Sequence, residues 1–328
     1  MVDEGVPPDV ELSLLDRSRT RAGEPDDAAL RHSVARAVRA EELGYHRFWV
    51  AEHHGVPGIA SGSPPVLIAA AAARTERIRL GSGGVMLPNH QPLVVAEQFA
   101  MLEALFPARI DLGVGRSLGF TPSVRRALHA ATTDTFADDL AELRAYLRGT
   151  APITARPRLD RDIPVFVLAT GKGLAVAGDA GLPVVVGGPI LSDDALRPML
   201  DDYRSRVRAA GGEPYVVVST DVLIADSTEE ARELALPEAW AMAASRTTGE
   251  FPALEPAELG RDMTVRQRTT VERAIARTVH GTEDAVAEQL DDLVNRAGAD
   301  ELLASSSTFD RAALADSDAR LARLLLRR

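Results

Sequence analysis

The chain has 328 residues, and its 37 lysine and arginine residues against 48 aspartate and glutamate residues give a formal charge of −11 at pH 7. A net negative protein repels phosphate backbones, so nucleic acid is not expected as the main partner. Hydrophobic residues make up 45% of the chain, which excludes disorder and indicates a sizeable core. The sequence contains no cysteine, which excludes disulfides, thiolate metal sites and cysteine nucleophiles.

The amino-terminal segment has no basic region followed by an apolar stretch, which is the pattern of an export signal. The longest apolar runs, such as 66–73 and 183–186, fall well short of the roughly 20 residues that a membrane span requires. The absence of cysteine also suits a reducing compartment. We therefore expect a cytoplasmic protein with no membrane partner.

Short β-like runs alternate with amphipathic helical stretches along the chain. The runs lie at 10–15, 47–50, 78–81, 109–112, 164–168, 183–186, 215–224 and 301–304. Strands that alternate with helices at roughly 30-residue spacing are typical of βαβ units and a parallel sheet. Eight such units favour a closed barrel over an open sheet. The sequence predicts an α/β fold, a (β/α)8 TIM barrel, with residues 1–328 forming a single domain.

Two of the intervals between consecutive predicted strands are longer than the others. After the fourth strand, residues 115–122 form a glycine-containing segment that we interpret as an extended loop at the active end of the barrel. Between the seventh and eighth strands, residues 225–279 include an acidic helical stretch and a proline-containing segment. We predict that this second segment is an insertion that acts as a lid over the site.

In a TIM barrel, catalytic groups lie at the carboxyl ends of the strands. Four consecutive strand ends carry chemically useful residues: Glu52, His53 and His54 after the second; Gly83 and Gly84, then Asn89 and His90, after the third; Arg116 after the fourth; and Ala169, Thr170 and Gly173 after the fifth. Glycines let a flat ligand approach the backbone closely. An arginine in a glycine-rich turn suits a phosphate, and free helix amides suit an anion.

The sequence lacks several well-defined functional motifs. Leu118 stands where the dinucleotide-binding fingerprint needs its third glycine, and the Gly171-Lys172 pair lacks the other residues of a P-loop. The adjacent His53 and His54 do not have the spacing of a zinc-protease helix. The sequence therefore predicts no nucleoside triphosphate site and no metal site.

The residues at these strand ends closely resemble those of the bacterial luciferase-like flavin-dependent monooxygenases. The likeness rests on the segments 42–54, 81–90, 96–98 and 113–116, and it extends from residue 12 to the segment 298–302. Within the family, the chain looks most like the branch found among antibiotic-tailoring oxygenases. The resemblance implies an enzyme that takes reduced FMN from a separate flavin reductase. It also implies a flavin hydroperoxide, formed with dioxygen, that oxygenates a small organic, polyketide-like substrate.

The resemblance also implies roles for individual residues. His53 matches the catalytic imidazole, and at its reference pKa of about 6.5 it could donate or accept a proton at neutral pH. The positions expected to bind the cofactor are Glu52, Gly83, Gly84, Arg116, Leu168, Ala169, Thr170 and Gly173, with a cis peptide at Gly83-Gly84 beside the ring and Arg116 on the phosphate. The positions expected to face the substrate are His54, Asn89 and His90.

Two other functions fit the same resemblance. Relatives use a deazaflavin for hydride transfer without dioxygen, and some luciferase-like subunits keep the barrel without a working site. The fifth-strand turn has Ala169 and Thr170 where the family often has a further hydroxyl residue. Dioxygen consumption would distinguish the first alternative, and saturable flavin binding the second. The family commonly forms dimers near the second and third strands, so we also expect a homodimer.

Overall fold

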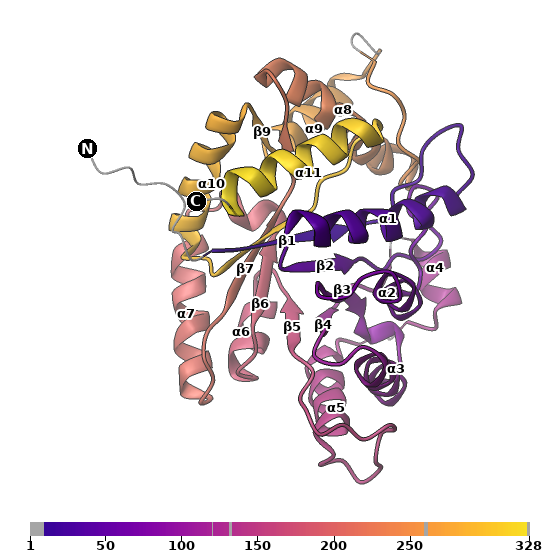
Figure 1. Cartoon of the computed structure of the whole chain (residues 1–328), viewed down its shortest axis with the longest axis vertical. Coiled ribbons are helices and arrows are strands. Elements are labelled where there is room, and N and C mark those ends of the chain that lie inside the picture. Colours follow the sequence, from indigo (N-terminus) through magenta and orange to yellow (C-terminus); the bar gives the residue numbers. More distant parts are fainter. Residues whose placement is uncertain (1–9, 120, 131–132, 259–261, 327–328) are drawn as a thin grey trace.

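The computed structural model describes residues 10–119, 121–130, 133–258 and 262–326, and it shows a closed parallel barrel surrounded by helices (Figure 1). Each barrel strand pairs with the strands before and after it, and the eighth barrel strand returns to pair with the first. The predicted TIM barrel is therefore confirmed. Within the described part of the chain, no helix is both long enough and apolar enough to cross a membrane.

The barrel strands occur close to their predicted positions. They are β1 (Glu11–Asp16), β2 (Arg47–Val50), β3 (Arg79–Met86), β4 (Ile110–Gly115), β5 (Val165–Leu168), β6 (Val184–Gly187), β7 (Val216–Thr220) and β10 (Glu301–Ala304). Most are almost wholly buried, because valine, leucine and isoleucine side chains face both the barrel interior and the helices outside.

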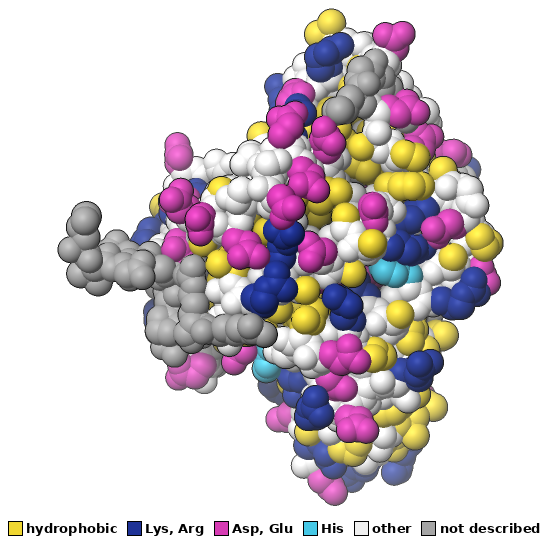
Figure 2. All heavy atoms as spheres, turned by 45° about the horizontal axis from the view of Figure 1, so that its top comes forward, with side chains coloured by type: hydrophobic (Ala, Val, Ile, Leu, Met, Phe, Trp, Pro, Cys, Tyr) yellow, Lys and Arg dark blue, Asp and Glu magenta, His cyan; other side chains and the backbone are white. Residues whose placement is uncertain are grey.

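Helices cover the outside of the barrel and follow most of the strands. They are α1 (Asp27–Leu43), α2 (Pro64–Ala72), α3 (Pro92–Leu105), α4 (Pro122–Ala127), α5 (Phe136–Arg148), α6 (Lys172–Asp179), α7 (Leu196–Ala209), α8 (Thr228–Thr248), α9 (Val265–Ile275), α10 (Glu283–Ala297) and α11 (Arg311–Leu326). Two short 3-10 turns, η1 (Leu87–Asn89) and η2 (Gly188–Ser192), follow β3 and β6. Acidic and basic side chains are mixed over the face shown in Figure 2 and form no basic stripe there.

The predicted seventh strand, 215–224, is wrong as a single strand. The chain leaves the barrel at Asp221, and β8 (Val222–Ile224) pairs instead with β9 (Val279–Gly281) in a separate two-stranded sheet. The carboxylate of Asp221 accepts hydrogen bonds from Arg17 Nη2 at 2.5 Å and from Ser305 Oγ at 2.8 Å. These long-range contacts hold the bend, and the apolar residues on both sides of it concealed it in the sequence.

Helices α8 and α9 lie between β8 and β9 and form the predicted insertion. Glu238 of α8 accepts hydrogen bonds from Arg17 Nη1 and Arg19 Nε, each at 2.8 Å, so the insertion is fixed to the loop after β1. Further along, the amide of Leu254 donates to the carbonyl of Thr20 at 2.9 Å. The insertion is therefore tied to the barrel at two points. Residue 120 of the predicted loop and residues 259–261 of the predicted lid lie outside the described residues.

A buried charge network fills the amino-terminal end of the barrel. Asp111 of β4 is fully buried and accepts hydrogen bonds from Arg47 Nη1 at 2.8 Å and from Arg79 Nη2 at 2.5 Å. Arg47 also donates to Glu301, which accepts a further hydrogen bond of 2.9 Å from the Tyr215 hydroxyl. Above this network, Trp49 and Phe166 lie edge to face among apolar side chains. The barrel is thus filled at this end and open at the other.

Candidate active site

A cavity of about 580 Å³ lies at the carboxyl ends of the strands. It brings together residues from β1 through β7 or from the loops that follow them. Its lining is Leu15, Ala51, Glu52, His53, His54, Gly83, Gly84, Met86, Gly115, Arg116, Ser117, Gly119, Leu168, Ala169, Thr170, Lys172, Val185, Gly187 and Ser219. Most of the residues predicted from the strand ends therefore meet in one cavity.

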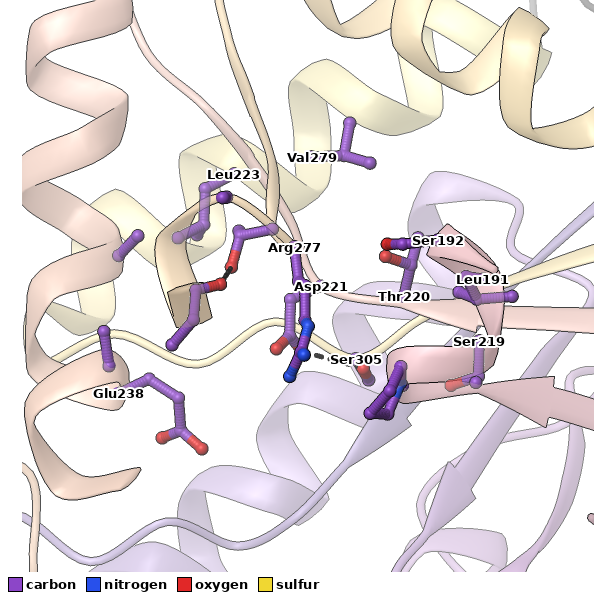
Figure 3. A pocket seen from close by; sticks show the side chains of 18 of the residues that line it. Leu191, Ser192, Ser219, Thr220, Asp221, Leu223, Glu238, Arg277, Val279 and Ser305 are labelled. Atoms are coloured by element: carbon purple, nitrogen blue, oxygen red, sulfur yellow. Dashed lines mark hydrogen bonds between the residues drawn. The ribbon is translucent and has the colours of Figure 1, made fainter. Parts of the chain in front are cut away.

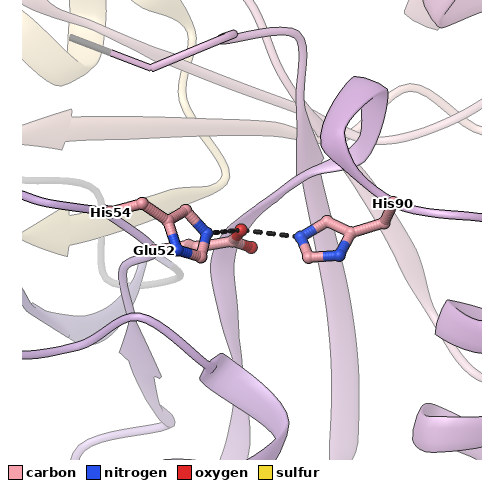
Figure 4. Close-up of side chains that lie close together, drawn as sticks. All are labelled: Glu52, His54 and His90. Atoms are coloured by element: carbon pink, nitrogen blue, oxygen red, sulfur yellow. Dashed lines mark hydrogen bonds and ion pairs between the residues drawn. The ribbon is translucent and has the colours of Figure 1, made fainter. Parts of the chain in front are cut away.

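Glu52 is buried just after β2, and its carboxylate is held by three donors, two of which are the imidazoles shown in Figure 4. Glu52 Oε1 lies 2.6 Å from His54 Nε2 and 2.7 Å from His90 Nε2, and Oε2 accepts the Met86 amide at 3.1 Å. Burial alone would raise the pKa of Glu52, but these hydrogen bonds outweigh burial and lower its pKa to about 2. Glu52 is therefore an anion that fixes the two imidazoles and the end of β3.

The same three residues have the composition of a metal site. The ligand atoms of Glu52, His54 and His90 lie within 4.8 Å of one another. Two imidazoles and one carboxylate form a ligand set that suits several divalent metals. In this structure, however, both Nε2 atoms are engaged with the same oxygen of Glu52 (Figure 4). The two Nε2 atoms and the Glu52 carboxylate are therefore engaged in hydrogen bonds with one another.

His53 lies between Glu52 and His54 in the chain, lines the cavity and donates its amide to the Ser61 carbonyl at 2.9 Å. Burial lowers the pKa of its imidazole to about 4, and the positive charges of Arg17 and Arg19 act in the same direction. The expectation of a pKa near 6.5 was therefore wrong. The error arose chiefly because the local sequence does not reveal how deeply the imidazole is buried, and secondly because it does not reveal that the two arginines lie nearby. At neutral pH the imidazole of His53 is uncharged.

Gly83 and Gly84 form one wall of the cavity, and this wall carries no side chains. The peptide between them is cis, as the resemblance implied. A Cβ atom at residue 84 would lie 2.8 Å from the Gly113 carbonyl oxygen, and one at residue 83 would lie 2.6 Å from the Leu15 side chain. Only glycine fits at these positions without displacing the neighbouring atoms. The wall is therefore backbone because the barrel strands leave no space for a side chain.

The segments after β4 and β5 contribute basic and hydroxyl groups to the cavity. The side chain of Arg116 is 45% exposed, and its guanidinium lies 3.9 Å from the carboxylate of Asp134, so most of its hydrogen-bonding capacity is available. Thr170 and Lys172 line the cavity at the turn between β5 and α6. Gly173 is not among the lining residues, and a Cβ there would lie 2.8 Å from the Ala169 methyl group. Its role visible in the structure is close packing of α6 onto β5.

The residues predicted to face the substrate divide into two groups. His54 lines the cavity, whereas Asn89 and His90 do not. His90 lies behind Glu52 and holds its carboxylate, and Asn89 Nδ2 lies 3.5 Å from the Ser117 carbonyl oxygen. Sequence reasoning did not identify Leu15, Ser117 or Ser219 as lining residues. Their positions at or beside strand ends were the available signal.

A second and larger cavity, of about 860 Å³, lies beneath the insertion (Figure 3). Its walls come from the ends of β7 and β10, from η2, and from α8, α9 and α10. Leu15, Gly187 and Ser219 line both cavities. The two cavities are therefore adjacent, and together they extend from the glycine wall to the helices of the insertion.

A closed (β/α)8 barrel with a cavity of converging polar groups at the carboxyl ends of its strands is the usual architecture of a TIM-barrel enzyme. The sequence model of the luciferase-like monooxygenases matches residues 10–301. A protein named luciferase-like monooxygenase from Escherichia coli (strain K12) is 34% identical over 93% of both chains. The chain therefore belongs to the luciferase-like monooxygenase family.

A second relative matches about half of the chain, and a solved structure matches nearly all of it. N-acetyl-S-alkylcysteine monooxygenase from Bacillus subtilis (strain 168) is 42% identical over 51% of this chain and 53% of its own length. The crystal structure of apo-MsnO8 superposes with a TM-score of 0.83 at 30% identity, covering 97% of this chain and 98% of that one. Both similarities agree with the family assignment.

Two structures of lower sequence identity contain bound cofactors. The oxygenating constituent of 3,6-diketocamphane monooxygenase from Pseudomonas putida, in complex with FMN, has a TM-score of 0.74 at 18% identity and covers 96% of this chain and 98% of its own. An F420-dependent secondary alcohol dehydrogenase has a TM-score of 0.70 at 16% identity and covers 96% and 99%. At these identities the similarity establishes the shared fold, and the fold accommodates either flavin type.

Proposed function

We propose that this protein is a monooxygenase that uses reduced FMN and dioxygen to oxygenate a small organic substrate. The observation that carries the proposal is one cavity in which His53 and Arg116 line the same space as the side-chain-free wall of Gly83 and Gly84. A planar ring fits against a backbone wall, and a guanidinium suits a phosphate. The cavity therefore has the groups needed for a flavin mononucleotide.

The lining residues suggest how the cofactor would be held. Gly83 and Gly84 would face the ring, while Arg116, Thr170 and Lys172 offer charged and hydroxyl donors for the phosphate. Reduced flavin, when bound, supplies two electrons with which dioxygen is split into one oxygen atom for the substrate and one for water. Because the reduced cofactor must come from elsewhere, we propose a separate flavin reductase as partner and the cytoplasm as location.

The environment of His53 supports a role as a neutral acid-base group. An uncharged imidazole has one nitrogen that accepts and one that donates a hydrogen bond. With its pKa lowered to about 4, His53 can accept a proton at neutral pH without first losing one. Glu52 holds its neighbour His54 in place and so helps to shape this part of the cavity.

The substrate assigned by the resemblance, a polyketide-like compound from antibiotic tailoring, stays a prediction. A curated relative named 4-hydroxyprotoasukamycin monooxygenase, from Streptomyces nodosus subsp. asukaensis, is 31% identical over 64% of this chain and 63% of its own length. It supports the proposal of an organic substrate of moderate size. The combined volume of the two adjacent cavities is consistent with such a substrate and a flavin.

Substitution of the phosphate-facing arginine tests the cofactor. We expect Arg116→Gln to weaken FMN binding by roughly 10- to 100-fold, because a hydrogen bond to a charged group contributes about 1.5–3 kcal/mol. The measurement is quenching of FMN fluorescence on titration with protein. Arg125→Gln is the matched control, because Arg125 lies on α4 outside the cavity lining. Equal affinities for the variant and the wild type would contradict the assignment of Arg116.

The same preparation distinguishes the competing functions. With reduced FMN, wild-type protein and a library of candidate organic compounds, a monooxygenase consumes dioxygen and incorporates one of its atoms into product. Turnover with reduced deazaflavin and no dioxygen would instead show hydride transfer. A protein with no saturable flavin binding would be a non-catalytic partner subunit.

We also propose that the protein is a homodimer that associates through α2 and α3. Val66, Val94, Met101 and Leu105 are large apolar side chains exposed on these helices, and the last three recur on one face of α3. We expect Met101→Glu to convert the dimer into monomers in analytical ultracentrifugation at micromolar concentration. Val265→Glu, at an 84% exposed position on α9, is the control and should stay dimeric. A monomeric wild type would refute this proposal.

A further inference from the structure

We infer that the cavity beneath the insertion binds an organic anion, through Arg246, Arg273 and Arg277, and that the substrate of this enzyme therefore carries a carboxylate or similar oxyanion on an apolar body. The inference rests on the proposed function in one respect, namely that the first cavity holds the flavin. The second cavity then has to hold the compound that reacts with it, because the two cavities share Leu15, Gly187 and Ser219.

The charges of the second cavity are unbalanced. Of its four carboxylates, Asp221 and Glu238 pair with Arg17, and Asp292 pairs with Arg296. Among the described residues, the side chains of Arg246, Arg273 and Arg277 make no ion pair and no hydrogen bond. These three cations face a single remaining carboxylate, that of Glu288. An excess of positive charge in one cavity of a protein with a net charge of −11 indicates a site for an anion.

The arginines come from two neighbouring helices and from the turn that follows one of them. Arg273 lies in the last turn of α9, Arg277 lies in the turn just after that helix, and both line the same cavity. Arg246 lies in the last turn of α8. The carbonyl ends of the helices favour nearby cations, but like charges that line one cavity repel each other. A bound anion would remove that repulsion, and guanidinium groups can hold both oxygens of a carboxylate.

The remaining wall of the cavity is apolar. Leu223, Ala235, Ala239 and Met242 line it from β8 and α8, and Leu223, Ala235 and Ala239 belong to a buried cluster. Hydroxyl groups of Ser219 and Thr220 lie toward the barrel, where the two cavities meet (Figure 3). A ligand with a charged end at the arginines and an apolar body along α8 would therefore extend toward the first cavity.

The test uses octanoate, octane-1-sulfonate and octan-1-ol as probes, with the full-length protein free of flavin and calorimetric titration as readout. We expect octanoate to bind about tenfold or more tightly than octan-1-ol, and added salt to reduce that preference. The double variant Arg273→Gln/Arg277→Gln should lose most of the preference while its affinity for octan-1-ol is unchanged. Arg268→Gln is the matched control, because Arg268 of α9 is exposed like Arg273 and Arg277 but lies outside the cavity lining. A stronger response to the sulfonate than to octanoate would identify a sulfonate as the bound group.

Three results would overturn the inference: equal binding of octanoate and octan-1-ol, an equal loss in Arg268→Gln, or a matching loss of FMN affinity in the double variant. The last result would place the flavin phosphate at these arginines. An FMN titration of the same proteins separates this failure from that of the proposed function. Absence of FMN binding with the octanoate preference retained would reject the flavin enzyme, while FMN binding without that preference would reject the anion site alone.

Discussion

Replacement of His53 by alanine is expected to reduce product formation by 10²- to 10⁴-fold, the usual contribution of a positioned acid-base group. The affinity for FMN should change by no more than about threefold, because the backbone wall and Arg116 remain in place. The measurement combines oxygenated product per flavin oxidised with an FMN titration, using an organic compound that the wild type oxygenates.

His46→Ala is the control for this variant, because His46 precedes β2 at the closed end of the barrel and does not line the cavity. The pH profile provides a second check. Protonation removes the base, so activity should fall as the pH decreases through the pKa of His53, about 4, and should stay level between pH 8 and 6. A decline centred near pH 6.5, or full turnover in His53→Ala, would refute the assigned role.

Gly84→Ala adds one methyl group to the cavity wall and is expected to reduce both the stability of the fold and the affinity for FMN. Its Cβ would lie 2.8 Å from the Gly113 carbonyl oxygen and 2.9 Å from the Leu168 side chain, so β3 would have to move away from β4. Such overpacking costs typically about 1–3 kcal/mol of folding free energy. We expect a lower melting temperature and a tenfold or greater loss of FMN affinity, since a displaced wall no longer fits the ring.

Gly115→Ala is the matched control for that substitution. Gly115 lines the same cavity at the end of β4, but a Cβ there would meet only the Leu168 side chain, at 3.9 Å, which is an ordinary contact. Thermal unfolding should therefore resemble that of the wild type. If Gly84→Ala and Gly115→Ala unfold at the same temperature, the close approach of β3 to β4 is not the reason that the wall requires glycine.

The strands that the sequence predicted best are apolar runs with clear boundaries. The run 301–304 matches β10 at both ends, and 47–50 matches β2. The end of β3 was missed, because the glycines at 81, 83 and 84 lower the local preference for strand although the barrel extends the strand to Met86. The division of the seventh run at Asp221 depends on partners far away in the chain, so no local pattern could reveal it.

In the candidate site, too, local sequence predicted some features, while others depend on contacts between distant parts of the chain. Residues that lie directly at strand ends, such as Glu52, Gly84 and Arg116, could be predicted to converge because parallel strands end on one side of a barrel. The position of His90 behind Glu52, and the low pKa of His53, depend on how separate loops pack. The second cavity depends on the placement of α8 and α9 above the barrel, and helix periodicity does not specify that placement.

The charge network of Arg47, Asp111 and Glu301 closes the end of the barrel opposite to the two cavities. None of these three residues lines either cavity. The closed end of the barrel is therefore held together independently of the residues that line the cavities. Substitution of the arginines that line the second cavity is therefore expected to change which compounds that cavity binds and to leave this network intact.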